Sequence, residues 1–177
     1  MNDPTSRRSA QRTLIAVGNA GRQLLRHAMD GRNGFDRTIL VAKPVPGLLA
    51  EPGVYHVQYL RDRVAACRCA EVLSHGAGQV SVFGAAGGRS TALILLRLAA
   101  ALSEQERVRV VVASPFSWED RRRQWRALYV RFRLQQMRGV KLSVVVTGKV
   151  EKEMDAETPM DHLLARIMQE AWESLVE

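Results

Sequence analysis

The feature that most constrains the fold of this chain is a series of short apolar runs separated by longer amphipathic segments. Residues 13–17, 38–42, 79–83, 108–113 and 142–146 form these runs. They lack the strict alternation of apolar and polar residues that marks a strand with one solvent-facing side. Strands of this kind are buried on both faces. The pattern therefore predicts a three-layer α/β sandwich, in which helices cover both faces of a mainly parallel sheet.

The segments between these runs supply the remaining elements. Residues 54–60 have the composition of a short edge strand, whereas residues 149–158 are polar and carry no predicted element. Residues 18–21 and 84–91 are predicted turns, because glycines there follow a strand and precede a helix. Helices, recognised by their apolar spacing, are predicted at 22–30, 61–75, 91–102, 121–141 and 159–176.

The length of 177 residues suits one domain, predicted at 13–177 behind a flexible basic arm at 1–12. Hydrophobic residues make up 46% of the chain and charged residues 25%, so a disordered chain is excluded. No apolar run has the length of a membrane span, and the amino terminus lacks the apolar region of a secretory signal. Two cysteines are too few for a disulfide framework. We expect free thiols in a cytoplasmic protein.

The net charge of +8 is concentrated in one part of the sequence. Residues 121–141 contain seven arginines and one lysine without any acidic residue. Residues 149–177 instead contain three basic and eight acidic residues. A chain with this asymmetry can bind a polyanion, or the opposite face of a neighbouring copy.

Two glycine-containing loops are candidate phosphate sites. Each follows a predicted strand and opens a predicted helix, where exposed amides attract anions. Neither loop has the spacing of a Walker A or dinucleotide-binding motif, so the alternative is a tight turn that only packs helix against sheet. The candidate residues are Gly18, Asn19 and Gly21 in the first loop and Gly87, Gly88, Arg89, Ser90 and Thr91 in the second.

A third candidate element begins at PFSWEDRRR, residues 115–123. Ser117 is the predicted N-cap of the basic helix. Glu119 and Arg123 are four residues apart, so they either form an ion pair or both face a ligand. The basic face is either simply solvated or a polyanion site, most simply for nucleic acid. One buried face is predicted from the spacing of Trp118, Trp125, Leu128, Tyr129 and Phe132.

Catalytic and metal-binding signatures are weak. The four histidines are scattered without ligand spacing, and a CxC pair alone is a weak metal signal. The sequence has no GxSxG motif and no plausible order for a catalytic triad. We predict neither a metal site nor a catalytic residue, and we interpret Cys67 and Cys69 as structural thiols.

The segment VRVVVASPFSWEDRRR, residues 108–123, resembles the GTP-binding domain of the FtsZ and tubulin-like family. In that family a strand precedes Pro-Phe-Asn-Phe-Glu-Gly and three basic residues. Pro115, Phe116, Glu119 and Arg123 match this pattern, and an aromatic residue is kept as Trp118. The glycine loop at 84–91 is similar to the phosphate loop of the family, with most of its glycines replaced.

The first loop is also similar to the start of an FtsZ. Val17, Gly18 and Gly21 match, and Gln23 stands where the family has Asn. The last helix resembles the long central helix that closes the nucleotide site, which places Asp161 near the residue that reads guanine. The resemblance therefore implies a Rossmann-like FtsZ/tubulin domain that binds GTP or GDP, with Glu119 and Arg123 on the ribose and phosphates.

The resemblance also carries expectations about activity. The sequence ends at Glu177, before the family's acidic hydrolysis loop and second domain, so we expect no efficient GTP hydrolysis and assign no catalytic residue. Self-association, an FtsZ-like partner and a role in the cytoskeleton or cell division follow only by family analogy, because a fold does not fix a function.

Three hypotheses are consistent with the sequence. The first is a guanine-nucleotide-binding module that acts by binding and by self- or partner-association. The second is a nucleotide-free scaffold that binds a protein partner. The third is a nucleic-acid-binding protein that uses the arginine-rich helix at 121–141. Nucleotide affinity, capture of a partner and salt-dependent binding of nucleic acid discriminate between them.

Overall fold

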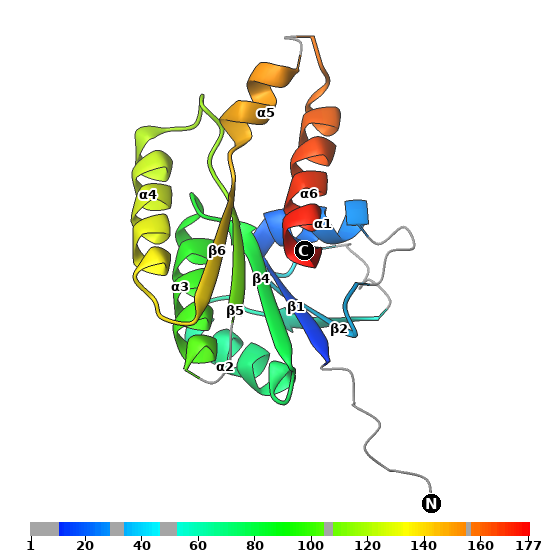
Figure 1. The fold of residues 1–177 in the computed structure, drawn as a ribbon, viewed down its shortest axis with the longest axis vertical. Coiled ribbons are helices and arrows are strands. Elements are labelled where there is room, and N and C mark those ends of the chain that lie inside the picture. Colours follow the sequence, from blue (N-terminus) through cyan, green and yellow to red (C-terminus); the bar gives the residue numbers. More distant parts are fainter. Residues whose placement is uncertain (1–10, 29–33, 47–52, 105–107, 155–156) are drawn as a thin grey trace, which may run out of the picture.

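The computed structural model describes residues 11–28, 34–46, 53–104, 108–154 and 157–177. Within these ranges the chain forms a six-stranded sheet with all neighbours parallel, as the apolar runs predict (Figure 1). The strands are β1 (Arg12–Val17), β2 (Arg37–Ala42), β3 (Val54–Gln58), β4 (Gln79–Ala85), β5 (Val108–Ala113) and β6 (Val140–Val145). The helices are α1 (Gly18–Ala28), α2 (Arg63–Ser74), α3 (Arg89–Ser103), α4 (Arg121–Gln135), α5 (Thr147–Glu153) and α6 (Met160–Val176).

The sheet separates two apolar layers, which explains the uninterrupted apolar strands. Leu14 and Ile15 are adjacent in β1 and both fully buried, but they belong to different layers. Ile15 packs on the side covered by α2, α3 and α4, whereas Leu14 packs on the side covered by α1 and α6 (Figure 1). Both faces of each central strand are therefore inside the protein.

The strand order β3-β2-β1-β4-β5-β6 reverses direction between β1 and β4. The chain leaves β1 toward α1 on one face of the sheet and leaves β4 toward α3 on the other (Figure 1). The two connections diverge from neighbouring strands and leave a crevice at the carboxyl edge. In open α/β sheets this switch point is the preferred place for a ligand.

Several element boundaries differ from the sequence prediction. Helix α1 begins directly at Gly18, because a positive φ of 71° lets the backbone turn from strand to helix in one residue, so 18–21 is not a separate turn. Helix α4 ends at Gln135 rather than 141, and β6 begins at Val140. The polar segment after β6 contains α5, which was not predicted. Residues 1–10 of the predicted arm lie outside the described ranges, and Arg12 belongs to β1.

The predicted buried face of α4 is wrong. The helix packs inward through small and aliphatic residues, Ala127, Val130 and Leu134. The aromatic stripe lies on the opposite, solvent-facing side, because helical spacing identifies which residues share a face but not which face meets the core. The exposed members of the stripe are Trp118, Trp125, Leu128, Tyr129 and Phe132.

Candidate functional site

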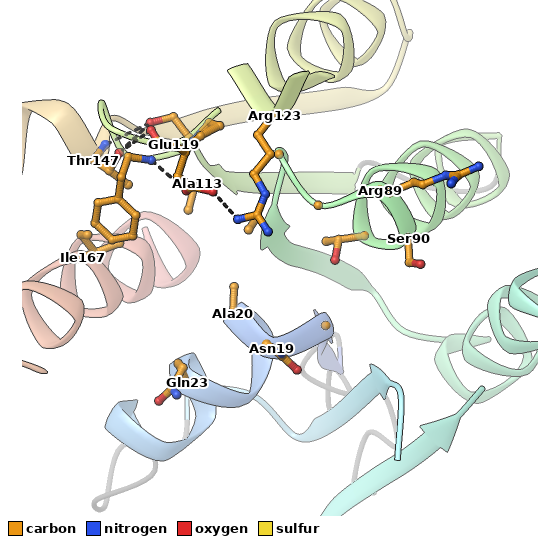
Figure 2. Close-up of a pocket in the computed structure, with 18 of the residues that line it drawn as sticks. Asn19, Ala20, Gln23, Arg89, Ser90, Ala113, Glu119, Arg123, Thr147 and Ile167 are labelled. Atoms are coloured by element: carbon orange, nitrogen blue, oxygen red, sulfur yellow. Dashed lines mark hydrogen bonds and ion pairs between the residues drawn. The ribbon is translucent and has the colours of Figure 1, made fainter. Parts of the chain in front are cut away.

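A cavity of about 630 Å³ opens at the carboxyl edge of the sheet, above the switch point between β1 and β4. Its walls come from the start of α1, the β4–α3 connection, the segment between β5 and α4, and the inner face of α6 (Figure 2). The lining residues with polar side chains are Asn19, Gln23, Lys43, Tyr59, Arg89, Ser90, Thr91, Ser114, Glu119, Arg123 and Thr147.

Two helices direct their amino termini at this cavity. Gly18 opens α1 and Thr91 lies in the first turn of α3, and the two residues are in contact. A Cβ added at Gly18 would lie 2.6 Å from Thr91 Oγ1, so only glycine fits between the helices. Neither helix has an acidic residue in its first turn. No acidic side chain in either first turn therefore offsets the positive end of the helix dipole.

The β4–α3 connection lies close against the segment that follows β5. A Cβ added at Gly87 would lie 2.9 Å from Pro115 Cγ, and the Gly87 carbonyl accepts a hydrogen bond of 2.6 Å from Arg126 Nη1. Gly88 is the N-cap of α3 and has no side chain with which to satisfy the helix amides. The Ala86 amide donates to the Ala113 carbonyl at 3.0 Å and the Gly88 amide to the Ala85 carbonyl at 3.4 Å, which hold the loop in place. The first-turn amides of α3, which have no side-chain cap, are the ones open to another acceptor.

Glu119 and Arg123 form the predicted ion pair across the first turn of α4. Glu119 Oε1 accepts a hydrogen bond of 3.0 Å from the Phe116 amide, which orients the carboxylate toward Arg123. The hydrogen bond and charge of Glu119 raise the pKa of Arg123 above its ordinary value, so the guanidinium is always charged. Figure 2 shows the Arg123 side chain pointing toward Asn19 and Ala20 of α1, whereas Arg89 points away from them.

A polar network that the sequence analysis missed supports this wall. Thr147 is buried, and its Oγ1 donates a hydrogen bond of 2.7 Å to the Pro115 carbonyl. Its amide donates to Ser114 Oγ at 3.0 Å. Together these contacts tie the start of α5 to the segment before α4. The available signal was positional, since Ser114 and Thr147 each closely follow an apolar strand and so lie at the same sheet edge.

The floor of the cavity is apolar and comes from α6. Leu164, Ile167 and Met168 line it, and their side chains repeat at the helical spacing of three and four residues. The apolar spacing of the sequence predicts this helix, but only the tertiary packing brings this face of it to the site. The cavity therefore combines a cationic, amide-rich end at α1, α3 and α4 with an apolar side at α6.

Most of the residues proposed from the sequence line this one cavity, but two do not. Gly21 is buried against β1, where an added Cβ would lie 2.7 Å from the Ala16 carbonyl carbon, so its role is packing. Asp161 is exposed in the first turn of α6 and is not among the lining residues. The proposed residues that do line it are Gly18, Asn19, Gly87, Gly88, Arg89, Ser90, Thr91, Glu119 and Arg123.

Other chemistry has little support in the described ranges. They contain no cluster of three or more His, Cys, Asp or Glu side chains that could hold a metal ion. Cys67 is buried, and this burial raises its pKa to about 11, whereas Cys69 is exposed. Among the described helices, none is both long and apolar enough to cross a membrane.

No protein-family model matches the sequence, and no curated protein matches it either. Solved structures do match. A mutant FtsZ from M. jannaschii superposes with a TM-score of 0.78 at 16% identity, covering 94% of this chain and 55% of that one. An empty FtsZ dimer from M. jannaschii gives 0.74 at 18% identity, covering 92% and 52%. CetZ2 from Haloferax volcanii, solved as a GTPγS-bound protofilament, gives 0.70 at 22% identity, covering 92% and 56%.

This chain thus spans about half the length of each of these proteins. The superposition nevertheless includes almost all of this chain, at sequence identities that by themselves carry little information. What the superpositions show is the shared fold of an α/β chain with a parallel sheet. The chain has an FtsZ/tubulin-like fold.

Proposed function

We propose that this protein is a guanine-nucleotide-binding module of the FtsZ/tubulin type that acts by binding and association. The observation that carries the proposal is the convergence of two helix amino termini and the Arg123 guanidinium on one cavity at the switch point. Each of these features favours an anionic ligand, and phosphate groups are the common ligands of such positions.

The residues present fit the phosphate part of a nucleotide. Gly87 and Gly88 place no side chain beside the first-turn amides of α3, and these amides lack a side-chain cap. Ser90 and Thr91 add hydroxyl donors next to these amides. The charge of Arg123 complements the phosphates. Glu119 both orients Arg123 and offers a carboxylate acceptor to a ribose hydroxyl.

The opposite side of the cavity fits a base. Ile167 and Met168 offer an apolar surface to the face of a purine, and Gln23 offers both a donor and an acceptor to its edge. The cavity volume of about 630 Å³ falls in the range of small-molecule sites. Guanine is proposed because CetZ2, which has this fold, was solved with GTPγS.

Association is the second part of the proposed function. Two of the matching structures were solved as a dimer and as a protofilament. We infer that nucleotide binding here is coupled to contact with another copy or with an FtsZ-like partner, and we assign no hydrolytic step to this chain. Sedimentation velocity with and without GTP measures the self-association directly.

Isothermal titration of nucleotide-stripped protein with GTP, GDP and ATP tests the binding. We expect GTP and GDP to bind and ATP to bind more weakly. Arg123→Ala should weaken GTP binding by about tenfold or more, because it removes a charge-assisted contact and leaves Glu119 facing the phosphates. Arg122→Ala is the matched control, since Arg122 is an exposed arginine on the same helix and does not line the cavity.

The outcomes separate the alternatives. Equal affinities of the two arginine variants would show that the nucleotide does not use this cavity. Absence of binding of all three nucleotides at about 1 mM, confirmed by equilibrium dialysis because binding can release no heat, would remove the proposal. The glycine loops would then be packing turns, as one of the sequence interpretations holds.

A further inference from the structure

The outer side of α4 carries a concentration of exposed apolar side chains that the nucleotide site does not use. Between 54% and 70% of the surface of each is accessible, although aromatic residues make up only 6% of the whole chain. We call this set the outer α4 face. Its members are Trp125, Leu128, Tyr129 and Phe132 of α4 together with Trp118, which precedes the helix.

The outer α4 face forms a crest along the helix, and its member Leu128 also lines a small pocket beside β6. Ala127, Val130 and Leu134 attach the helix to the core, so the bulky side chains project from the opposite side. In Figure 1, α4 forms an outer edge of the molecule, next to α3 and β6. At 1.5 Å per residue, the helix presents this crest over roughly 20 Å. A crest of this shape fits a surface that can deform around it.

The charge along α4 has one sign, whereas Glu119 and Asp120 lie just before the helix, next to Trp118. Residues 121–150 contain seven arginines, two lysines and no acidic residue. Arg121, Arg122 and Arg133 are exposed beside the aromatic residues, and the Arg133 guanidinium lies 5.9 Å from the centre of the Tyr129 ring. Exposed tryptophan, tyrosine and phenylalanine flanked by arginine is the composition of a helix that lies in a lipid headgroup region.

We propose that the outer α4 face docks on an anionic membrane surface, with its aromatic side chains at the headgroup boundary and its arginines among the lipid phosphates. Anionic headgroups complement the exposed arginines of α4, a helix that contains no acidic residue. Trp, Tyr, Phe and Leu all partition favourably into this boundary. Single-stranded nucleic acid could bind the same arginines. Its bases, however, stack on aromatic rings that line a groove. Here the exposed rings share the crest with Leu128, which offers no ring for stacking.

Vesicle co-sedimentation of the full chain tests the proposal, with phosphatidylcholine vesicles compared to vesicles that also contain phosphatidylserine. We expect binding only to the anionic vesicles, weakened by salt because part of the attraction is electrostatic. Trp125→Ser combined with Phe132→Ser should reduce binding by about tenfold or more, since both apolar anchors are lost. Tyr55→Ser is the matched control, because Tyr55 is 51% exposed on β3, at the other edge of the sheet.

Tryptophan fluorescence gives a second readout. The sequence has three tryptophans, and Trp172 packs edge-on against Phe35, away from α4. Anionic vesicles should shift the emission of the native protein to shorter wavelength, and Trp118→Phe with Trp125→Phe should abolish the shift. The proposal is overturned if anionic vesicles neither sediment the protein nor shift its emission. It is also overturned if a single-stranded oligonucleotide binds in the same buffer while vesicles do not.

Discussion

At the scale of single residues, Gly18 connects the two halves of the candidate site. It follows β1, opens α1 and lies against Thr91 of α3. Its backbone has a φ of 71°. Two separate requirements therefore fall on one position. The backbone conformation disfavours any side chain, and the close approach to Thr91 leaves no space for one.

Substitutions at two glycines separate these requirements. Gly76→Ala meets only the backbone penalty, because Gly76 has a φ of 77° and nothing lies within 4 Å of an added Cβ. We expect it to lower the free energy of unfolding by about 1 kcal/mol. Gly18→Ala adds the clash with Thr91 and should cost about 3 kcal/mol. Denaturant unfolding measures both values.

A double variant checks the cause of the difference. Thr91→Ala removes the clashing Oγ1, which would lie 2.6 Å from a Cβ added at Gly18, and also Cγ2. The Cβ of residue 91 stays, at an ordinary contact distance of 3.8 Å. In that background, Gly18→Ala should cost no more than Gly76→Ala. An undiminished cost would place the strain elsewhere in the β1–α1 connection.

The sequence predicted some site residues because their relation is local. Glu119 and Arg123 are one helical turn apart, so their pairing required no knowledge of the fold. Gly21 was assigned from its glycine loop as well as the resemblance, and Asp161 from the resemblance alone; neither is among the residues that line the cavity. Thr147, Leu164 and Ile167 were missed because only the tertiary packing of β6 and α6 brings them to the glycine loops.

At the scale of elements, the N-cap of α4 was predicted three residues too early, although the helix begins at Arg121 as predicted. Ser117 has the preferred chemistry of an N-cap, but Asp120 is the cap, and its Oδ1 accepts a hydrogen bond of 2.9 Å from the Arg123 amide. The Ser117 amide is instead bound by Glu151 of α5, an element absent from the sequence prediction. Long-range contacts thus selected between two adequate local caps.

This assignment predicts unequal effects of two alanine substitutions. Asp120→Ala should lower the free energy of unfolding by about 1 kcal/mol, because it removes the cap and a favourable charge at the helix amino terminus. Ser117→Ala should change it by less than about 0.5 kcal/mol, since Ser117 is exposed and its amide contact is retained. Thermal unfolding followed by circular dichroism compares them. Equal losses of stability in the two variants would mean that Ser117 contributes to the cap as much as Asp120 does.

At the scale of the whole molecule, the fold was predictable because burial on both faces marks every central strand. Val110 and Val111 are neighbours in β5, are fully buried and pack into opposite layers, so an uninterrupted apolar run is required. The apolar runs do not reveal the strand order, because each strand pairs with partners distant in sequence. The prediction of which face of α4 is buried was wrong for a related reason, since an exposed aromatic face and a buried one have the same periodicity.

The same architecture predicts how a ligand affects stability. The cavity is lined by α1, α3 and α6 and by the ends of β4 and β5, so occupation connects elements from both apolar layers. A nucleotide that binds only the folded chain should stabilise it by about 2.7 kcal/mol at a hundredfold its Kd, a rise in Tm of about 5–10 °C. Differential scanning calorimetry with GTP measures this rise. It should persist in Arg122→Ala and shrink in Arg123→Ala, because of these two only Arg123 reaches the cavity. A rise of equal size in both variants would mean that the nucleotide binds the cationic surface of α4 instead.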